Sequence, residues 1–287
     1  MATAQASYTT GTVTSADGTT IGYRKLGAGP GLLLVSGGYL AAQHYMALAR
    51  PLSSTFTVYV MDRRGRGRSG PPGERYRMAR ECEDVAALLA GTGTRLVFGH
   101  SSGGLIALQA ALESPAITKV AVYEPALSMY GAFDLSWRAR FERELDRGRP
   151  AEALVTFSKG VSNNRWMTLL PRWLLVRAID RYFRRRSKRE RPDEESLVEL
   201  FPLQRLDVQI FNEMASSDGF ADLRADVLLL DGVRTPPPVH NAIDALHATL
   251  PRAERVTLAG VGHEAPLSTA GAPLVADELR AFFGRPS

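Results

Sequence analysis

The sequence predicts an α/β fold: a mostly parallel sheet flanked by helices, with an inserted helical segment. Three observations predict it. Short apolar runs alternate with longer amphipathic stretches along most of the chain. This alternation stops at about residues 125–222 and then resumes. One apolar run also ends in a serine flanked by glycines, directly before a helical stretch. A chain of 287 residues has room for one such core with one insertion.

The first expected element is a β-hairpin, with strands at 11–14 and 20–25 joined by a turn at Asp17-Gly18. The run LLLV at 32–35 is bounded by glycines and is typical of a strand buried on both faces. The elements expected next are a helix near 43–50, a strand at 57–61 and a helix near 78–89.

The alternation then continues and predicts right-handed crossovers between parallel strands. The remaining expected elements are strands at 95–99, 119–123, 226–230 and 255–260, and helices at 102–113, near 239–250 and up to Phe283. Residues 125–222 are rich in Arg and Trp and contain no strand-like apolar run, so we expect them to be helical. The sequence therefore predicts a core of residues 1–124 and 223–287 and an insertion of residues 125–222.

The composition is that of an ordinary globular protein, with 45% hydrophobic and 23% charged residues. The N-terminus lacks a basic segment followed by an apolar one, and no later run is long and uncharged enough for a membrane span. We therefore expect a soluble, cytoplasmic protein. Cys82 is the only cysteine, which excludes an internal disulfide and a cysteine-rich metal site.

The net charge of +5 has a local source. Six basic residues fall within eight positions: Arg184, Arg185, Arg186, Lys188, Arg189 and Arg191. Such a run is typical of a solvated helix face or a loop, and an acidic substrate, carrier or partner is the alternative. No zinc-finger, helix-turn-helix or RNA-recognition pattern accompanies it, so we expect no nucleic acid partner.

The sequence Gly99-His100-Ser101-Ser102-Gly103 carries the clearest chemical signal. A serine hydroxyl is a weak nucleophile, so it needs a neighbouring base and an exposed position. The G-x-S-x-G pattern supplies exposure by placing the serine in a strained turn between a strand and a helix, where glycines permit close packing. The pattern alone is moderately specific, but its strand-turn-helix context predicts Ser101 as a nucleophile.

With these motifs, the chain resembles the α/β-hydrolase family from about residue 11 to residue 284. The segment DRRGRGRS at 62–69 is similar to that family's D-x-R-G-x-G-x-S turn after the fourth strand, and we expect it to be structural. Anion binding by its arginines is the alternative. The resemblance implies a Ser, acid and His triad, a helical cap formed by residues 125–222, and no metal or organic cofactor.

The resemblance places the general base in the loop after the last strand, where GVGHEAP contains His263. The other four histidines do not fit. His44, His240 and His247 fall in expected helices or at their starts, and the side chain of His100 is expected to point away from the reacting centre.

The triad acid must lie between Ser101 and His263 in the chain. Relatives usually place it after the strand that precedes the last one, but here that loop contains Thr235 where the acid is expected. Haloalkane dehalogenases place it after the strand that follows the nucleophile's helix, and Glu124 occupies that position. We expect Glu124 to be the acid, with Asp231 as the alternative.

An oxyanion hole needs two backbone N–H donors. The resemblance implies one from Ser102, at a helix N-terminus, and one from the loop after LLLV. That loop reads Ser36-Gly37-Gly38-Tyr39 where relatives commonly have His-Gly, and Gly38 is the candidate. A serine rather than an aspartate at position 101 favours acyl transfer over the alkyl-ester chemistry of dehalogenases and epoxide hydrolases.

Caps in this family cover the nucleophile and shape the pocket. An apolar lining is expected from Phe157, Trp166, Met167, Leu169, Leu170, Trp173, Leu174 and Leu175, with ordinary packing between cap and core as the alternative. Taken together, these residues favour a bulky apolar small-molecule substrate.

The sequence thus predicts a serine hydrolase acting on an ester, lactone or thioester. A non-hydrolytic enzyme with the same fold is one alternative, such as a lyase, a cofactor-free peroxidase-type enzyme or a natural-product tailoring enzyme. A non-catalytic protein that binds a small molecule is another, since Ser36 and Thr235 depart from the family pattern.

Overall fold

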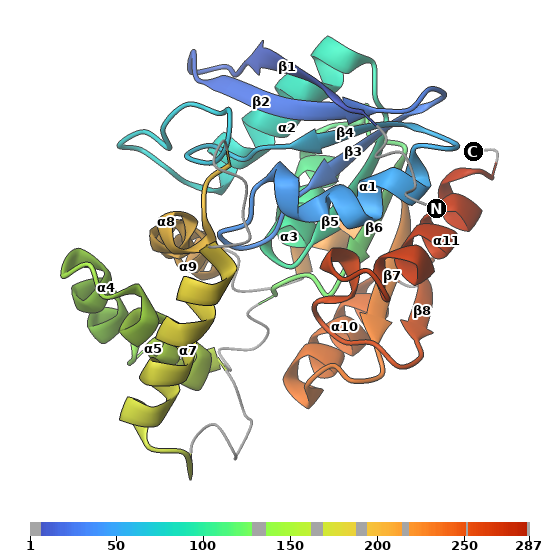
Figure 1. Cartoon of the computed structure of the whole chain (residues 1–287). Helices are drawn as coiled ribbons and strands as arrows, with labels where there is room; N and C mark the ends of the chain where they lie inside the picture. Colours follow the sequence, from blue (N-terminus) through green and yellow to red (C-terminus); the bar gives the residue numbers. More distant parts are fainter. Residues whose placement is uncertain are drawn as a thin grey trace, which may run out of the picture.

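A computed structural model describes residues 7–127, 136–161, 169–187, 194–213, 218–250 and 252–285. Its centre is an eight-stranded sheet with the order β1-β2-β4-β3-β5-β6-β7-β8 (Figure 1). The strands are β1 (Thr9–Thr14), β2 (Thr20–Leu26), β3 (Gly31–Val35), β4 (Thr57–Met61), β5 (Leu96–His100), β6 (Lys119–Tyr123), β7 (Asp226–Gly232) and β8 (Glu254–Leu258). Strands β1 and β2 form the expected antiparallel hairpin, and β3 to β8 are parallel. The predicted α/β fold with a mostly parallel sheet is confirmed.

Helices cover both faces of this sheet. Helices α1 (Met46–Leu52) and α11 (Ala272–Phe283) pack on one face. Helices α2 (Met78–Thr92), α3 (Ser102–Glu113) and α10 (Pro237–Thr249) pack on the other. The central strands are buried on both sides, as the unbroken apolar run of β3 predicts. Each fully buried aliphatic side chain contributes about 1.5–3 kcal/mol, so the two apolar clusters stabilise the sheet that carries the site.

The expected elements and the observed ones agree closely. The strands at 57–61 and 119–123 and the helix at 102–113 have the predicted bounds. The helix expected near 43–50 is a 3-10 turn, η1 (Ala42–Tyr45), followed by α1. The single thiol, Cys82, lies buried in α2. Among the helices described, none combines the length and the apolar character that a membrane crossing requires.

The regular elements described between β6 and β7 are all helical, as expected. They are α4 (Arg138–Asp146), α5 (Pro150–Val161), α7 (Arg172–Ser187), α8 (Leu197–Leu200), η3 (Phe201–Leu203), α9 (Gln204–Glu213) and η4 (Asp218–Asp222). Several of them share an apolar cluster of their own, which includes Phe141, Phe183 and Phe201. In Figure 1, α8 and α9 lie nearest the sheet, whereas α4, α5 and α7 lie farther out.

Candidate active site

Ser101 lies at the sharp turn between β5 and α3, with a φ of 54°. Two glycines make this turn sterically feasible. A Cβ on Gly99 would come within 2.2 Å of the carbonyl oxygen of Gly103, and a Cβ on Gly103 within 2.3 Å of that of Val35. Left-handed backbone is unfavourable for a serine, so the packing of β5 against α3 holds it there. The turn places Ser101 in the wall of a pocket of about 480 Å³.

Glu124 follows the end of β6 and is the other non-glycine residue with positive φ, at 45°, in the described chain. Its buried carboxylate has three partners. Oε1 accepts from the backbone N–H of Gly232 at 3.1 Å and from the hydroxyl of Thr235. Oε2 lies 2.8 Å from Nδ1 of His263. The carboxylate is thus held by three donors, which fixes its orientation toward the histidine.

His263 follows β8, and its side chain is 41% exposed. The protein atoms around the ring remove part of its water and disfavour its charged form, but the hydrogen bond and the charge of Glu124 outweigh this and raise the pKa of His263 above its ordinary value of 6.5. Because the carboxylate of Glu124 accepts from Nδ1–H, the neutral ring keeps a free electron pair on Nε2. His263 and Ser101 line the same pocket.

Asp231, the alternative acid, has other partners. Its Oδ2 lies 2.7 Å from Nδ1 of His240 and 3.3 Å from the Arg255 guanidinium. The side chain is fully buried, and its Oδ1 has no hydrogen-bond partner among the residues that the structure describes. Asp231 therefore anchors α10 and β8 together, whereas Glu124 holds His263.

Gly38 and Ser102 also lie next to each other. The N–H of Gly38 donates to Oγ of Ser102 at 2.7 Å, and Gly38 has a φ of 52° that favours glycine. Ser102 is the first residue of α3, where the helix leaves its first N–H groups without intrahelical partners. Gly38 lines the pocket and Ser102 is buried directly behind it, and the Gly38 N–H is bonded to the Ser102 hydroxyl.

The side chain of His100 does not point away from the site as expected. Its ring lines the pocket, with its centroid 4.7 Å from that of His263. Its Nε2 lies 3.0 Å from the carbonyl oxygen of His263, and its Nδ1 lies 2.7 Å from the hydroxyl of Tyr45. His100 is the last residue of β5 and lies on the same face as Phe98, against Tyr45 and Tyr123. Its place beside the nucleophile did not reveal that the loop carrying His263 packs against this face.

Burial lowers the pKa of His100 well below its ordinary value, so the ring is neutral. The carbonyl of His263 can only accept, so Nε2 carries the hydrogen and Nδ1 accepts from Tyr45. Tyr45 in turn accepts from the N–H of Gly37 at 2.8 Å. This chain of hydrogen bonds joins the Gly37-Gly38 loop to the loop that carries His263.

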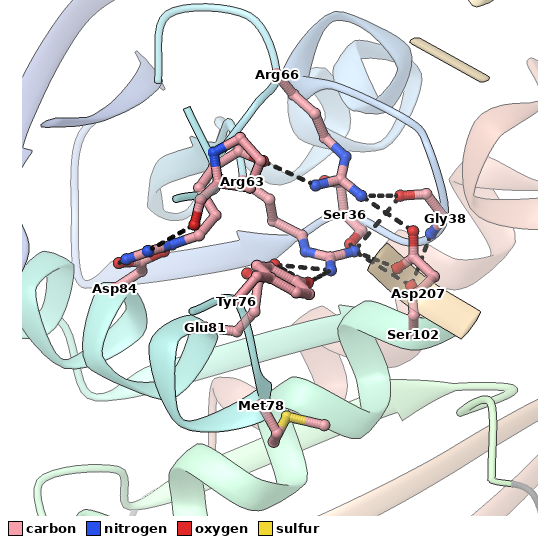
Figure 2. Close-up of polar contacts among 12 residues, drawn as sticks. Ser36, Gly38, Arg63, Arg66, Tyr76, Met78, Glu81, Asp84, Ser102 and Asp207 are labelled. Atoms are coloured by element: carbon pink, nitrogen blue, oxygen red, sulfur yellow. Dashed lines mark hydrogen bonds and ion pairs between the residues drawn. The ribbon is translucent and has the colours of Figure 1, made fainter. Parts of the chain in front are cut away.

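Two buried arginines lie behind the Gly38 loop (Figure 2). Arg66 donates to the carbonyl of Gly38 at 2.7 Å and to Asp207 at 3.0 Å. Arg63 donates to the other oxygen of Asp207 at 2.8 Å. Asp207 belongs to α9, so these ion pairs connect the inserted helices to the loop that presents the Gly38 amide.

The Arg63 guanidinium also contacts residues of the core. It donates to Glu81 at 2.8 Å and to Oγ of Ser102 at 3.2 Å (Figure 2). Burial disfavours its charge, but Asp207 and Glu81 outweigh this and raise the pKa of Arg63. The neighbouring Arg64 pairs separately with Asp84 at 2.5 Å. Three arginines of the 62–69 segment, Arg63, Arg64 and Arg66, thus form buried ion pairs, as a structural segment predicts, but nothing in the sequence singled out Asp207 as the partner of Arg63 and Arg66.

The pocket is not lined as the sequence analysis expected. Trp166 and Met167 lie outside the described residues, and none of the other six expected residues lines the pocket. Phe157 instead packs in the apolar cluster of the inserted helices, and Leu169, Leu170, Trp173 and Leu174 are exposed. Sequence composition marks apolar residues but does not tell which side of an inserted helix faces the core.

The pocket wall combines apolar and polar side chains. Its apolar members are Leu40, Leu197, Phe211 and Leu267. Its polar members near the inserted helices include Tyr182, Arg186 and Gln204. Of the basic run at 184–191, Arg184, Arg185 and Arg186 lie exposed in the last turn of α7. Residues 188–193 lie outside the described residues.

Comparison of the sequence with known proteins gives a matching family and a partly similar relative. The sequence profile of the family described as "Alpha/beta hydrolase family" matches residues 32–277. The uncharacterized hydrolase YraK of Bacillus subtilis (strain 168) is 30% identical over 164 residues, which are 55% of this chain and 60% of that protein. The chain thus matches less than two thirds of that relative's length.

Two solved structures are similar over nearly the whole chain. An alpha/beta hydrolase from Sphaerobacter thermophilus DSM 20745 superposes with a TM-score of 0.76 and 28% identity, covering 93% of this chain and 99% of that one. The esterase RhEst1 from Rhodococcus sp. ECU1013 gives a TM-score of 0.69 at 20% identity, covering 97% and 99%. The second likeness concerns the fold alone.

Proposed function

The chain belongs to the alpha/beta hydrolase family, and from this premise we propose that it is a serine hydrolase that cleaves an ester, lactone or thioester through an acyl-enzyme on Ser101. The observation that carries the proposal is the hydrogen bond between Glu124 and His263 at 2.8 Å, beside a strained serine in the same pocket. A base oriented by a buried carboxylate is what an unactivated serine needs.

In the first half of the reaction, Nε2 of His263 takes the proton of the Ser101 hydroxyl as its oxygen attacks the substrate carbonyl. Glu124 stabilises the resulting imidazolium, because its carboxylate group accepts from Nδ1–H. The imidazolium then gives its proton to the leaving oxygen or sulfur. The C–O or C–S bond breaks, and the acyl group remains on Ser101.

In the second half, a water molecule takes the place of the leaving group. His263 removes one of its protons as the water oxygen attacks the acyl carbon, and then returns a proton to Oγ of Ser101. The carboxylic acid leaves and the free enzyme is restored. Glu124 keeps the same hydrogen bond throughout, so it orients the base without exchanging a proton.

The proposed oxyanion donors are the backbone N–H groups of Gly38 and Ser102. At rest, the Gly38 N–H donates to the Ser102 hydroxyl, so the oxyanion must take the place of that hydroxyl. Arg63 also donates to the same hydroxyl, at 3.2 Å, and so Ser102 keeps a partner when Gly38 turns to the substrate. A negative oxyanion is favoured further by the N-terminus of α3.

Residues 125–222 are proposed to act as a cap over this pocket. Tyr182 and Arg186 of α7 and Gln204 of α9 contribute to its wall, together with His263 and Leu267 of the core. A volume of about 480 Å³ suits a medium-sized organic substrate. The acyl or alcohol part of that substrate would contact Leu40, Leu197 and Phe211, which supports a largely apolar ester.

Fluorophosphonate labelling tests this proposal. The probe phosphonylates only a serine activated by a base and releases fluoride, and mass spectrometry of the peptides identifies the modified residue. We expect the label on Ser101, none on Ser101→Ala, and strongly slowed labelling of His263→Ala. Ser102→Ala is the matched control, because it removes the adjacent hydroxyl and keeps the backbone N–H. A wild-type protein that stays unlabelled, or a label on Ser102, would contradict the proposal.

A further inference from the structure

The outer side of α7 and the two leucines before it carry an apolar surface. Seven large apolar side chains are exposed in the described part of the chain, and five of them fall within 169–182. They are Leu169 (70% exposed), Leu170 (41%), Trp173 (62%), Leu174 (43%) and Tyr182 (49%). We call these five residues the α7 patch. Exposed apolar residues are normally scattered, so such a cluster indicates a surface that something covers.

The same helix is strongly basic. Helix α7 contains six arginines and one aspartate, a formal charge of +5. The whole chain also has a net charge of +5, so the remainder of the protein is electrically balanced. In the described structure, no ion pair is formed by Arg177, Arg181 or Arg185, and all three are exposed. The positive charge of the protein is therefore concentrated where the α7 patch lies.

At about 100° per residue, helical spacing places Trp173, Leu174, Arg177, Arg181 and Arg185 within one arc of roughly 120°, and Tyr182 lies beyond the border of that arc, on the side of the pocket. Arg177 and Arg181 follow Trp173 by four and eight residues, and Arg185 follows Leu174 by eleven. The opposite face is the buried one: Phe183 is 3% exposed, and Val176 and Ile179 pack in the apolar cluster of the inserted helices. Trp173 is 62% exposed, and Arg177, Arg181 and Arg185 are exposed as well. The face with Trp173 and the arginines is thus directed outward.

The α7 patch also reaches the rim of the candidate active site. Tyr182, its last member, lines the pocket that contains Ser101, together with Arg186 one turn further on. A partner that covers the patch as far as Tyr182 therefore lies beside the pocket.

We propose that α7 docks on an anionic lipid membrane, with the α7 patch inserted at the headgroup level and the arginines contacting lipid phosphates. Trp and Leu with interspersed arginines on one helix face are typical of helices that lie in the membrane interface. A second copy of the chain fits less well, since pairing would bring two helices of +5 together. A nucleic acid would leave Leu169 and Leu170 in water.

Docking by α7 has a consequence for the substrate, which rests on the proposed function. The pocket rim would lie against the membrane, so an amphiphilic ester could enter from the lipid phase without crossing water. Activity on an ester dissolved in anionic vesicles would then exceed activity on the same ester in neutral vesicles.

Vesicle co-sedimentation tests the docking. The whole protein is mixed with vesicles of phosphatidylcholine alone or with one-third phosphatidylglycerol, at low and high salt. We expect binding to the anionic vesicles that is lost at high salt, because lipid attraction is screened. Each arginine near an anionic surface contributes roughly fivefold in partitioning, about 1 kcal/mol. Arg177→Glu with Arg181→Glu is therefore expected to weaken binding by at least about 25-fold.

Two matched controls keep the test specific. Arg95→Glu with Arg252→Glu changes the net charge equally, but these exposed arginines precede the amino ends of β5 and β8. Leu274→Ala matches Trp173→Ala as the loss of an exposed apolar side chain. We expect both controls to bind like the wild type and Trp173→Ala to bind several-fold more weakly. Trp173 fluorescence is expected to shift to the blue on binding.

Several results would overturn the docking proposal: equal binding to neutral and anionic vesicles, no binding to either, equal loss in both arginine pairs, or a stable dimer in solution that buries Trp173. Preferential retention on nucleic acid would do the same. Fluorophosphonate labelling of Ser101 is measured on the same samples without vesicles. Intact labelling with no vesicle binding rejects the docking and leaves the proposed function standing.

Discussion

Thr235 donates its hydroxyl hydrogen to Oε1 of Glu124. Thr235 stands in the loop after β7, where the resemblance led us to expect the acid, and Glu124 follows β6. These two strands are parallel neighbours, with Tyr123 paired to Leu230. Their carboxyl ends therefore meet at one place, and a carboxylate that follows β6 can reach the histidine there. In this chain the loop after β7 supplies the donor, and the strand beside it supplies the carboxylate.

Replacing Thr235 with valine is expected to lower kcat for a soluble ester about 10- to 100-fold, since a hydrogen bond to a charged group contributes about 1.5–3 kcal/mol. The carboxylate would keep Gly232 N–H but lose the hydroxyl that holds it toward His263. Thr235→Ser keeps the hydroxyl and is expected to stay near the wild-type kcat. If valine and serine behaved alike, the hydroxyl would have no role in orienting Glu124.

The two candidate acids are separated by Glu124→Gln and Asp231→Asn. Glu124→Gln removes the charge that stabilises the imidazolium and the acceptor that fixes its tautomer, so kcat/KM is expected to fall about 10⁴-fold. Asp231 holds His240 and Arg255, so Asp231→Asn is expected to lower the melting temperature and to leave kcat/KM of the folded enzyme within about tenfold. The opposite ranking of the two activities would assign the role to Asp231.

The pH dependence of kcat/KM reports on His263. Only its neutral form can accept the serine proton, so activity rises as pH increases through its pKa. Glu124 raises that pKa, and the acid limb is therefore expected above pH 6.5. In Glu124→Gln the raising contribution is lost, burial remains, and the acid limb moves to lower pH. If the acid limb fell at the same pH in both proteins, Glu124 would not control the pKa of His263.

The buried pair of Arg63 and Arg66 with Asp207 predicts that the inserted helices hold the Gly38 loop in place. In Asp207→Asn, the buried guanidinium groups of Arg63 and Arg66 lose the carboxylate that they share, which lowers the free energy of unfolding by about 3–5 kcal/mol. We also expect kcat of the folded protein to fall at least about tenfold, because Gly38 loses its support. KM is expected to change little, since Asp207 does not line the pocket.

Asp84→Asn is the matched control for that variant. It breaks the buried pair with Arg64, which does not contact the Gly38 loop. Thermal unfolding is expected to show destabilisation in both variants, and kcat measured well below the melting temperature is expected to fall only in Asp207→Asn. Equal losses of kcat would mean that the ion pairs serve stability alone.

Much of the fold could be predicted because its signals are local. Short apolar runs buried on both faces and the G-x-S-x-G turn depend on neighbouring residues, and β4, β6 and α3 appear with the expected bounds. Phe157 and Trp173 show where local signals fail. Both are apolar residues of helical segments, yet one is packed in a cluster and the other is 62% exposed. Which side of a helix is buried depends on its partners, which periodicity in a basic, irregular segment does not reveal.

The sequence by itself determined the parallel core, the serine turn and the small set of residues able to serve as base and acid. Only the tertiary structure decided which of these residues contact one another. Glu124 reaches His263 across 139 positions of chain, and Asp207 reaches Arg63 across 144. Such contacts form only when strands from distant segments end at the same edge and an inserted helix packs beside them, because hydrogen bonds and buried ion pairs require atoms within about 3 Å.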